Sequence, residues 1–139
     1  MKAPLLYSRI LGKGRRLLMN FIFVALGGAA GAMGRYAISL LPARTEFPVL
    51  TFITNILGAV LIGFIVGLTE SRESVSSHAV LFWKTGVCGG FTTFSTFSLE
   101  SYTLLQNKKY FLGSGYMLLS VICCLIGVFC GRKLAMAVH

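Results

Sequence analysis

The chain has 139 residues and a formal net charge of +9, and 55% of its residues are hydrophobic while 12% carry a charge. A mean hydropathy of +0.79 is too high for a single soluble core of this size and indicates an integral membrane protein. The basic residues stand near the ends of apolar segments, where they orient membrane helices, so the positive charge does not indicate nucleic-acid binding.

Four apolar segments are long enough to cross the hydrocarbon layer, which takes about 20 helical residues. They are residues 20–41, 49–69, 79–105 and 111–131. We therefore predict an all-α membrane domain over residues 19–133, with a basic extension over residues 1–18 and a tail over residues 134–139. Because little sequence lies outside the spans, and no nucleophile–base pair or metal cluster is apparent, we expect no enzyme.

The distribution of Lys and Arg bears on how the chain inserts. If the spans alternate, nine basic residues lie on the side of the N-terminus and four on the other, which favours a cytoplasmic N-terminus. Without residues 1–18 the count is four against four, and the chain has no preferred orientation. The remaining residues are Arg72, Lys84, Arg132 and Lys133 on one side, and Arg35, Arg44, Lys108 and Lys109 on the other. Met19 is thus a candidate for the true first residue.

The first span contains the glycine-rich sequence GGAAGAMGRY, residues 27–36. Gly27 and Gly31 form a small-xxx-small pair, which predicts close packing against another helix. Arg35 stands near the end of the span, where it either reaches the headgroups or attracts anions to an aqueous vestibule. A cleaved signal peptide is the alternative for this segment, but the apolar sequence resumes after Arg35 and reaches spanning length.

The second span is apolar apart from two threonines and Asn55, and it repeats the small-xxx-small pattern at Gly63 and Gly67. An asparagine in hydrocarbon needs partners for its amide donors and its carbonyl acceptor. Two alternatives stay open for Asn55: a hydrogen bond to a neighbouring helix, or contact with a permeating species.

The third span carries GGFTTFSTF, residues 89–97. The Gly89–Gly90 pair predicts a broken helix, and backbone carbonyls freed at membrane depth can bind a cation. Beyond the pair, helical spacing places Phe94 and Phe97 on one stripe and hydroxyls, including Thr96, on another. Rings, hydroxyls and an amide together favour an anion route, because ring edges are positive. The role of Glu100 beside this route stays open.

The last span places Tyr116, Ser120 and Cys124 about four residues apart on one helix face. The hydroxyls of Tyr116 and Ser120 would continue a donor-lined path. The cysteines lack the spacing of a zinc site or a disulfide framework, so we interpret them as small apolar residues.

These motifs, in this order, resemble those of the fluoride channel family called Fluc or CrcB, over residues 19–133. The resemblance implies a four-helix protein with a broken third helix that forms an antiparallel, dual-topology homodimer. It further implies two pores through which fluoride passively leaves the cell across the cytoplasmic membrane, which lowers fluoride toxicity. A structural sodium ion, which is not transported, would sit at the dimer centre.

Carried over residue by residue, the resemblance places the sodium ion on backbone carbonyls of Gly89 and Thr92. The pore phenylalanines correspond to Phe94 and Phe97, the pore amide to Asn55, and the polar residues of the fourth helix to Tyr116 and Ser120. Cys124 stands where some relatives have a further hydroxyl. The basic extension departs from the family pattern and should bias insertion, so it would require a partner of opposite orientation.

Two other classes compete with this interpretation. A proton-coupled exporter of the small multidrug-resistance type also has four short helices, but it typically carries a carboxylate in the first helix. Here that helix has no acid, and Glu100 in the third segment is the one acid within a span. A membrane scaffold would explain the glycines but not the clustered donors and the broken helix.

Overall fold

The computed structural model describes residues 3–71 and 75–138, and the regular secondary structure in these ranges is helical throughout. Side chains are described for residues 12–70 and 75–138. The helices in chain order are α1 (Ala3–Ser39), α2 (Val49–Ser71), α3 (Ser77–Val80), the π-helix η1 (Leu81–Cys88), α4 (Gly89–Phe91), α5 (Phe94–Gln106) and α6 (Tyr110–Ala137). Lys2, Arg72 and His139 lie outside the described residues, as does the side chain of Arg9.

Three stretches of helix have the length and composition of membrane spans. They are Gly12–Ser39, Val49–Glu70 and Tyr110–Ala137. They confirm an all-helical protein with several membrane-capable helices. The expected span over residues 79–105 is instead divided among α3, η1, α4 and α5, each shorter than a bilayer. A count of four spans therefore stays a prediction.

The predicted break in the third segment is confirmed. The chain leaves the helix after Phe91, and both Thr92 (φ −78°, ψ 156°) and Thr93 (φ −146°, ψ 111°) are extended. The break therefore lies two residues beyond Gly90. Gly89 and Gly90 remain helical, and Gly90 packs closely against α1, because a Cβ there would overlap the carbonyl of Gly28.

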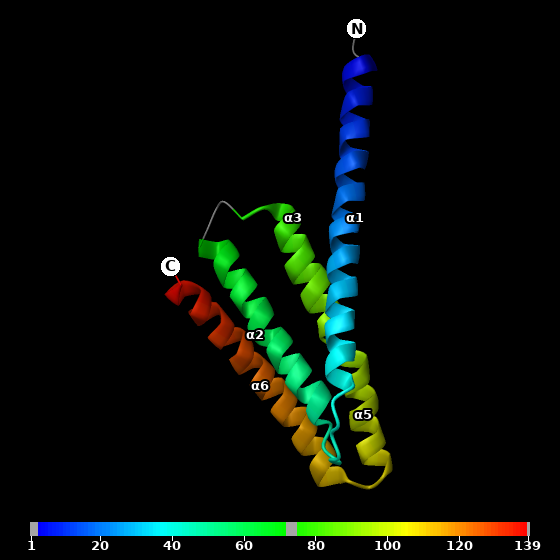
Figure 1. Ribbon diagram of the computed structural model, residues 1–139, viewed down its shortest axis with the longest axis vertical. Coiled ribbons are helices and arrows are strands. Elements are labelled where there is room, and N and C mark those ends of the chain that lie inside the picture. Colours follow the sequence, from blue (N-terminus) through cyan, green and yellow to red (C-terminus); the bar gives the residue numbers. More distant parts are fainter. Residues whose placement is uncertain (1–2, 72–74, 139) are drawn as a thin grey trace.

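The helices are arranged as two pairs that diverge toward the end with the two termini (Figure 1). In one pair α2 packs along α6, and in the other α1 packs along η1 and α4. At the opposite end α5 packs against α6 and brings the two pairs together. The broken segment thus lies between α1 on one side and the α2–α6 pair on the other.

Glycines account for how closely the helices of each pair approach. A Cβ atom at Gly27 would overlap the carbonyl of Phe82, and one at Gly31 would overlap the carbonyl of Val87. The α2–α6 pair uses the same device, because a Cβ at Gly63 would overlap the carbonyl of Val128. The small-xxx-small prediction is confirmed at these positions, and the partners are now identified as η1 and α6.

The outer surface of the helices is strongly apolar. Large side chains such as Phe21 (72% exposed), Phe111 (95%) and Phe129 (63%) point away from the rest of the chain. Few residues form a core among the described side chains, and its fully buried large members are Tyr116 and Cys88. An apolar surface of this extent fits contact with lipid or with another protein chain.

We predict that Gly27→Ala lowers the stability of the purified protein by roughly 1–3 kcal/mol, because the added methyl group forces α1 away from η1. Gly28→Ala is the matched control, because a Cβ there meets no atom within 4 Å. Denaturant unfolding in detergent measures both variants. Equal stability of the two variants would contradict the packing role of Gly27.

Candidate functional site

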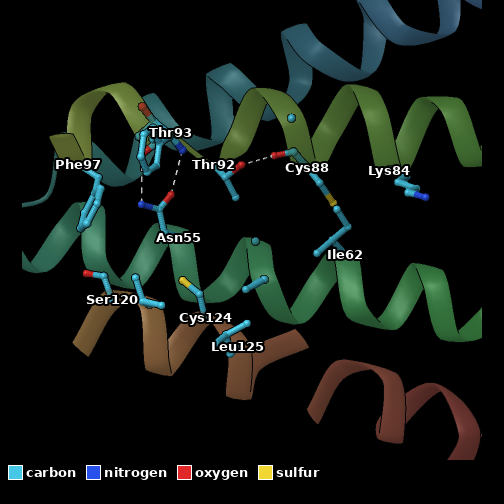
Figure 2. Close-up of a pocket in the computed structure, with 15 residues that line it drawn as sticks. Asn55, Ile62, Lys84, Cys88, Thr92, Thr93, Phe97, Ser120, Cys124 and Leu125 are labelled. Carbon is cyan, nitrogen blue, oxygen red and sulfur yellow. Dashed lines mark hydrogen bonds between the residues drawn. The ribbon is translucent and has the colours of Figure 1, made fainter. Parts of the chain in front are cut away.

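The extended backbone at the helix break is held by one side chain from α2. The Thr93 amide donates a hydrogen bond to Oδ1 of Asn55 at 2.9 Å, and Nδ2 of Asn55 donates to the Thr93 carbonyl at 3.3 Å (Figure 2). Asn55 therefore satisfies both backbone groups of Thr93, as a neighbouring strand would. Of the two alternatives for Asn55, the structure shows the hydrogen bond to a neighbouring helical segment.

Thr93 also caps the helix that follows the break. Its Oγ1 accepts a hydrogen bond from the Thr96 amide at 3.2 Å and lies 3.0 Å from the Thr96 hydroxyl. A threonine at this position satisfies an otherwise unpaired amide of the first turn. The predicted hydroxyl stripe at Thr96 thus takes part in starting α5.

These hydrogen bonds redirect two amides that a continuous helix would use elsewhere. In an unbroken helix the Thr93 amide would donate to the Gly89 carbonyl, and the Thr96 amide to the Thr92 carbonyl. Asn55 and the Thr93 hydroxyl accept them instead. Gly89 and Thr92, the two residues expected to offer carbonyls to a cation, are therefore the ones whose usual helical donors are displaced.

Arg35 joins α1 to the broken segment. Its Nε donates a hydrogen bond to the Gly90 carbonyl at 3.2 Å, and the residue is half-buried. A guanidinium at this place also meets the negative end of the short helix α4. Arg35, the predicted vestibule residue, therefore contacts Gly90, the residue next to Gly89.

A cavity of about 470 Å³ lies between the broken segment and the α2–α6 pair (Figure 2). It brings together six of the predicted site residues, Asn55, Gly89, Thr92, Phe94, Phe97 and Ser120. Its other lining residues are Gly58, Ala59, Ile62, Lys84, Cys88, Thr93, Val121, Cys124 and Leu125. Arg35, Thr96 and Tyr116 do not line it.

The predicted aromatic stripe is present at one end of the cavity. The ring centroids of Phe94 and Phe97 lie 5.7 Å apart, and Phe97 lies 5.2 Å from the ring of Tyr116 at an angle of 52°. Tyr116 is fully buried, whereas Phe94 is 80% exposed. Phe97 is thus supported from behind, while Phe94 projects from the chain.

Ser120 lines this cavity, and its hydroxyl has no partner among the described residues. Its Oγ is buried and forms no hydrogen bond within the described part of the chain. Only 6% of the residue is exposed. A buried hydroxyl without a partner costs free energy, so its position favours an occupant that accepts its hydrogen bond.

Glu100 has two hydroxyl partners that the sequence did not identify. Oε1 accepts a hydrogen bond from Thr51 and Oε2 accepts one from Tyr116, each at 2.8 Å. The Thr96 hydroxyl bonds to Thr93 and not to Glu100. The Tyr116 hydroxyl therefore faces Glu100, and only Ser120 and Cys124 of the predicted face reach the cavity.

Comparison with known proteins places most of the helical region in one family. The family model described as "CrcB-like protein, Camphor Resistance (CrcB)" matches residues 22–132. A "Fluoride-specific ion channel FluC" of Clostridium perfringens is 45% identical over 124 residues, which cover 87% of this chain and 96% of the relative. A protein of the same name from Flavobacterium psychrophilum is 39% identical over 121 residues, covering 85% and 98%. "Fluoride-specific ion channel FluC 1" of Ligilactobacillus salivarius is 46% identical over 115 residues, covering 81% and 96%.

We predict that Asn55→Ala increases hydrogen exchange at the Thr93 amide, because that amide loses its acceptor. The expected loss of local protection is roughly 1–3 kcal/mol, the cost of unpaired polar groups in a buried place. Thr69→Ala on the same helix is the control, because the Thr69 hydroxyl bonds to Val66 within α2. Unchanged exchange of the peptide over residues 89–97 would show that Asn55 does not hold the break.

Proposed function

The chain belongs to the CrcB family, and from this membership we propose that it is a fluoride channel in a cell membrane. Fluoride passes down its own gradient, and at high internal concentration it leaves the cytoplasm across the inner membrane. The names of the relatives support the choice of ion. The observation that carries the proposal is a cavity lined by Phe94, Phe97 and Ser120, whose buried hydroxyl has no partner among the described residues.

The cavity offers an anion a replacement for part of its water. Ser120 supplies a hydrogen-bond donor, and the positive edges of the Phe94 and Phe97 rings supply weaker electrostatic contacts. Near these rings no lining residue carries a full charge that would trap the ion. Conduction needs both properties: the site must bind the ion strongly enough to replace its water, and weakly enough to release the ion again.

In this proposal the remaining predicted residues hold the lining of the cavity in place. Thr96 fixes the start of α5 through Thr93, and Tyr116 supports Phe97 while it donates to Glu100. Asn55 fixes the break and lines the cavity, so one side chain serves both purposes. Because Glu100 already has two donors and does not line the cavity, the structure does not favour the exporter, which needs an accessible carboxylate.

We propose that a second copy in the opposite orientation completes the site. The diverging helix pairs and the exposed apolar side chains, Phe94 included, leave a large surface for such a partner. If the spans alternate, residues 19–139 place four basic residues on each side of the membrane. This balance suits a chain that inserts in both orientations. A chain that begins at Met1 should insert with its N-terminus in the cytoplasm, and so requires a partner of opposite orientation.

A sodium ion on the Gly89 and Thr92 carbonyls of both copies would join them. The residues fit such an ion, because the usual helical donors to these carbonyls are displaced and sodium prefers oxygen ligands. The ion would supply fixed positive charge and a bridge between two broken helices. Arg35, bonded to Gly90, would add positive potential near the same place.

Flux from liposomes tests the proposed function. The purified chain should release fluoride, and not chloride, from loaded vesicles without a pH gradient. Proton-dependent uptake of an organic cation with no fluoride flux would instead select the exporter. Chloride flux equal to fluoride flux would reject the fluoride channel.

We predict that Phe97→Ile lowers fluoride flux at least about tenfold, equivalent to roughly 1.4 kcal/mol in the barrier, because the ring edge is lost. Phe94→Ile should act in the same direction. Phe129→Ile is the control, because Phe129 is exposed on α6 and does not line the cavity. Unchanged flux in Phe97→Ile would remove the rings from the pathway.

Replacing sodium with N-methylglucamine should lower the fraction of dimer in detergent. This organic cation is larger than sodium and cannot take its place between the two copies. Chemical cross-linking followed by mass measurement reports that fraction, and potassium chloride serves as the ionic-strength control. A dimer fraction independent of sodium would contradict the proposed ion, and a monomer under all conditions would contradict the proposed partner.

A further inference from the structure

Lys84 lies at the end of the cavity opposite to Phe97 (Figure 2). It belongs to η1 and is exposed, and it forms no hydrogen bond or ion pair with any described residue. From the sequence alone this lysine is simply one basic residue among those that orient the chain. In the structure its side chain lines the same cavity as Phe97 and Ser120, the predicted anion contacts.

Lys84 lies on the face of η1 that lines the cavity. Lys84, Cys88 and Thr92 follow one another at intervals of four residues, and helical residues four apart lie on one face. All three line the cavity. Gly86 and Gly90 lie on another face, against the backbone of α1.

The charge of Lys84 is not neutralised at the cavity. None of the lining residues is acidic. Other basic residues are engaged elsewhere: Arg132 pairs with Glu70, and Lys109 pairs with Glu46 at 2.6 Å. A fixed charge beside apolar walls produces a stronger field than the same charge in bulk water.

We propose that Lys84 is the residue that concentrates anions at the mouth of the cavity, ahead of the uncharged contacts at Ser120 and Phe97. This inference rests on the proposed function and deepens it by assigning the step of anion capture. Lys84 attracts the hydrated ion, and Ser120 with the ring edges then replaces its water. The arrangement separates the strong charge from the contacts at Ser120 and Phe97, so attraction does not become trapping.

Fluoride efflux from liposomes at low ionic strength tests the proposal. Lys84→Gln should lower the initial rate by roughly three- to tenfold at subsaturating fluoride, because local anion concentration falls. Lys84→Arg should retain most of the rate. In high salt the difference between Lys84→Gln and the unmodified chain should shrink, since the field of an exposed charge is screened within about 3 Å at 1 M.

Lys133→Gln is the matched control. It removes one positive charge from the same predicted side of the membrane, so it changes the orientation balance equally, but Lys133 lies over the Phe129 ring and does not line the cavity. Its flux should equal that of the unmodified chain. Size-exclusion chromatography of every variant checks that folding is intact.

The outcomes separate the two proposals. If the unmodified chain passes no fluoride, the proposed function fails and the role of Lys84 fails with it. If it passes fluoride and Lys84→Gln matches it at low salt, the channel stands and the role of Lys84 is overturned. The role is also overturned if Lys84→Arg loses as much flux as Lys84→Gln, or if Lys133→Gln loses as much.

Discussion

Two hydrogen bonds between Asn55 and Thr93 determine the shape of the site. A chain that leaves its helix inside an apolar environment exposes an amide and a carbonyl that lipid cannot satisfy, and leaving such a group unpaired costs roughly 1–3 kcal/mol. Asn55 offers one donor and one acceptor to the same residue and removes both costs. The break at Thr92 and Thr93 is therefore stable only where α2 brings an amide side chain to it.

The rest of the structure follows from opening the helix at that point. The displaced amides of Thr93 and Thr96 leave the Gly89 and Thr92 carbonyls without their usual donors. Glycine contacts press η1 and α4 against α1, so the opposite face of the broken segment is turned toward α2 and α6. That face and the α2–α6 pair form the cavity, which Phe97 and Ser120 both line.

The sequence predicted the elements of this arrangement better than their pairings. Apolar length predicted four spans, and three of them are membrane-capable helices in the structure. Gly89–Gly90 indicated a break within two residues of its place. Helical spacing correctly joined Phe94 to Phe97 because it concerns residues on one helix. It left the partners of Glu100 open, because Thr51 and Tyr116 come from other helices. Contacts of that kind depend on how each helix is rotated and shifted, which a single apolar sequence does not specify. For the same reason the sequence did not predict that Lys84 lines the cavity, because this depends on how η1 is rotated relative to α2 and α6.

The most direct test of the central claim is solid-state NMR of the chain in lipid bilayers, with ¹³C labels on threonine and glycine. The account predicts extended-backbone chemical shifts at Thr92 and Thr93, helical shifts at Gly89 and Gly90, and loss of the extended shifts in Asn55→Ala. Helical shifts at Thr92 and Thr93 in the unmodified chain would contradict it, because no break would then exist for Asn55 to hold.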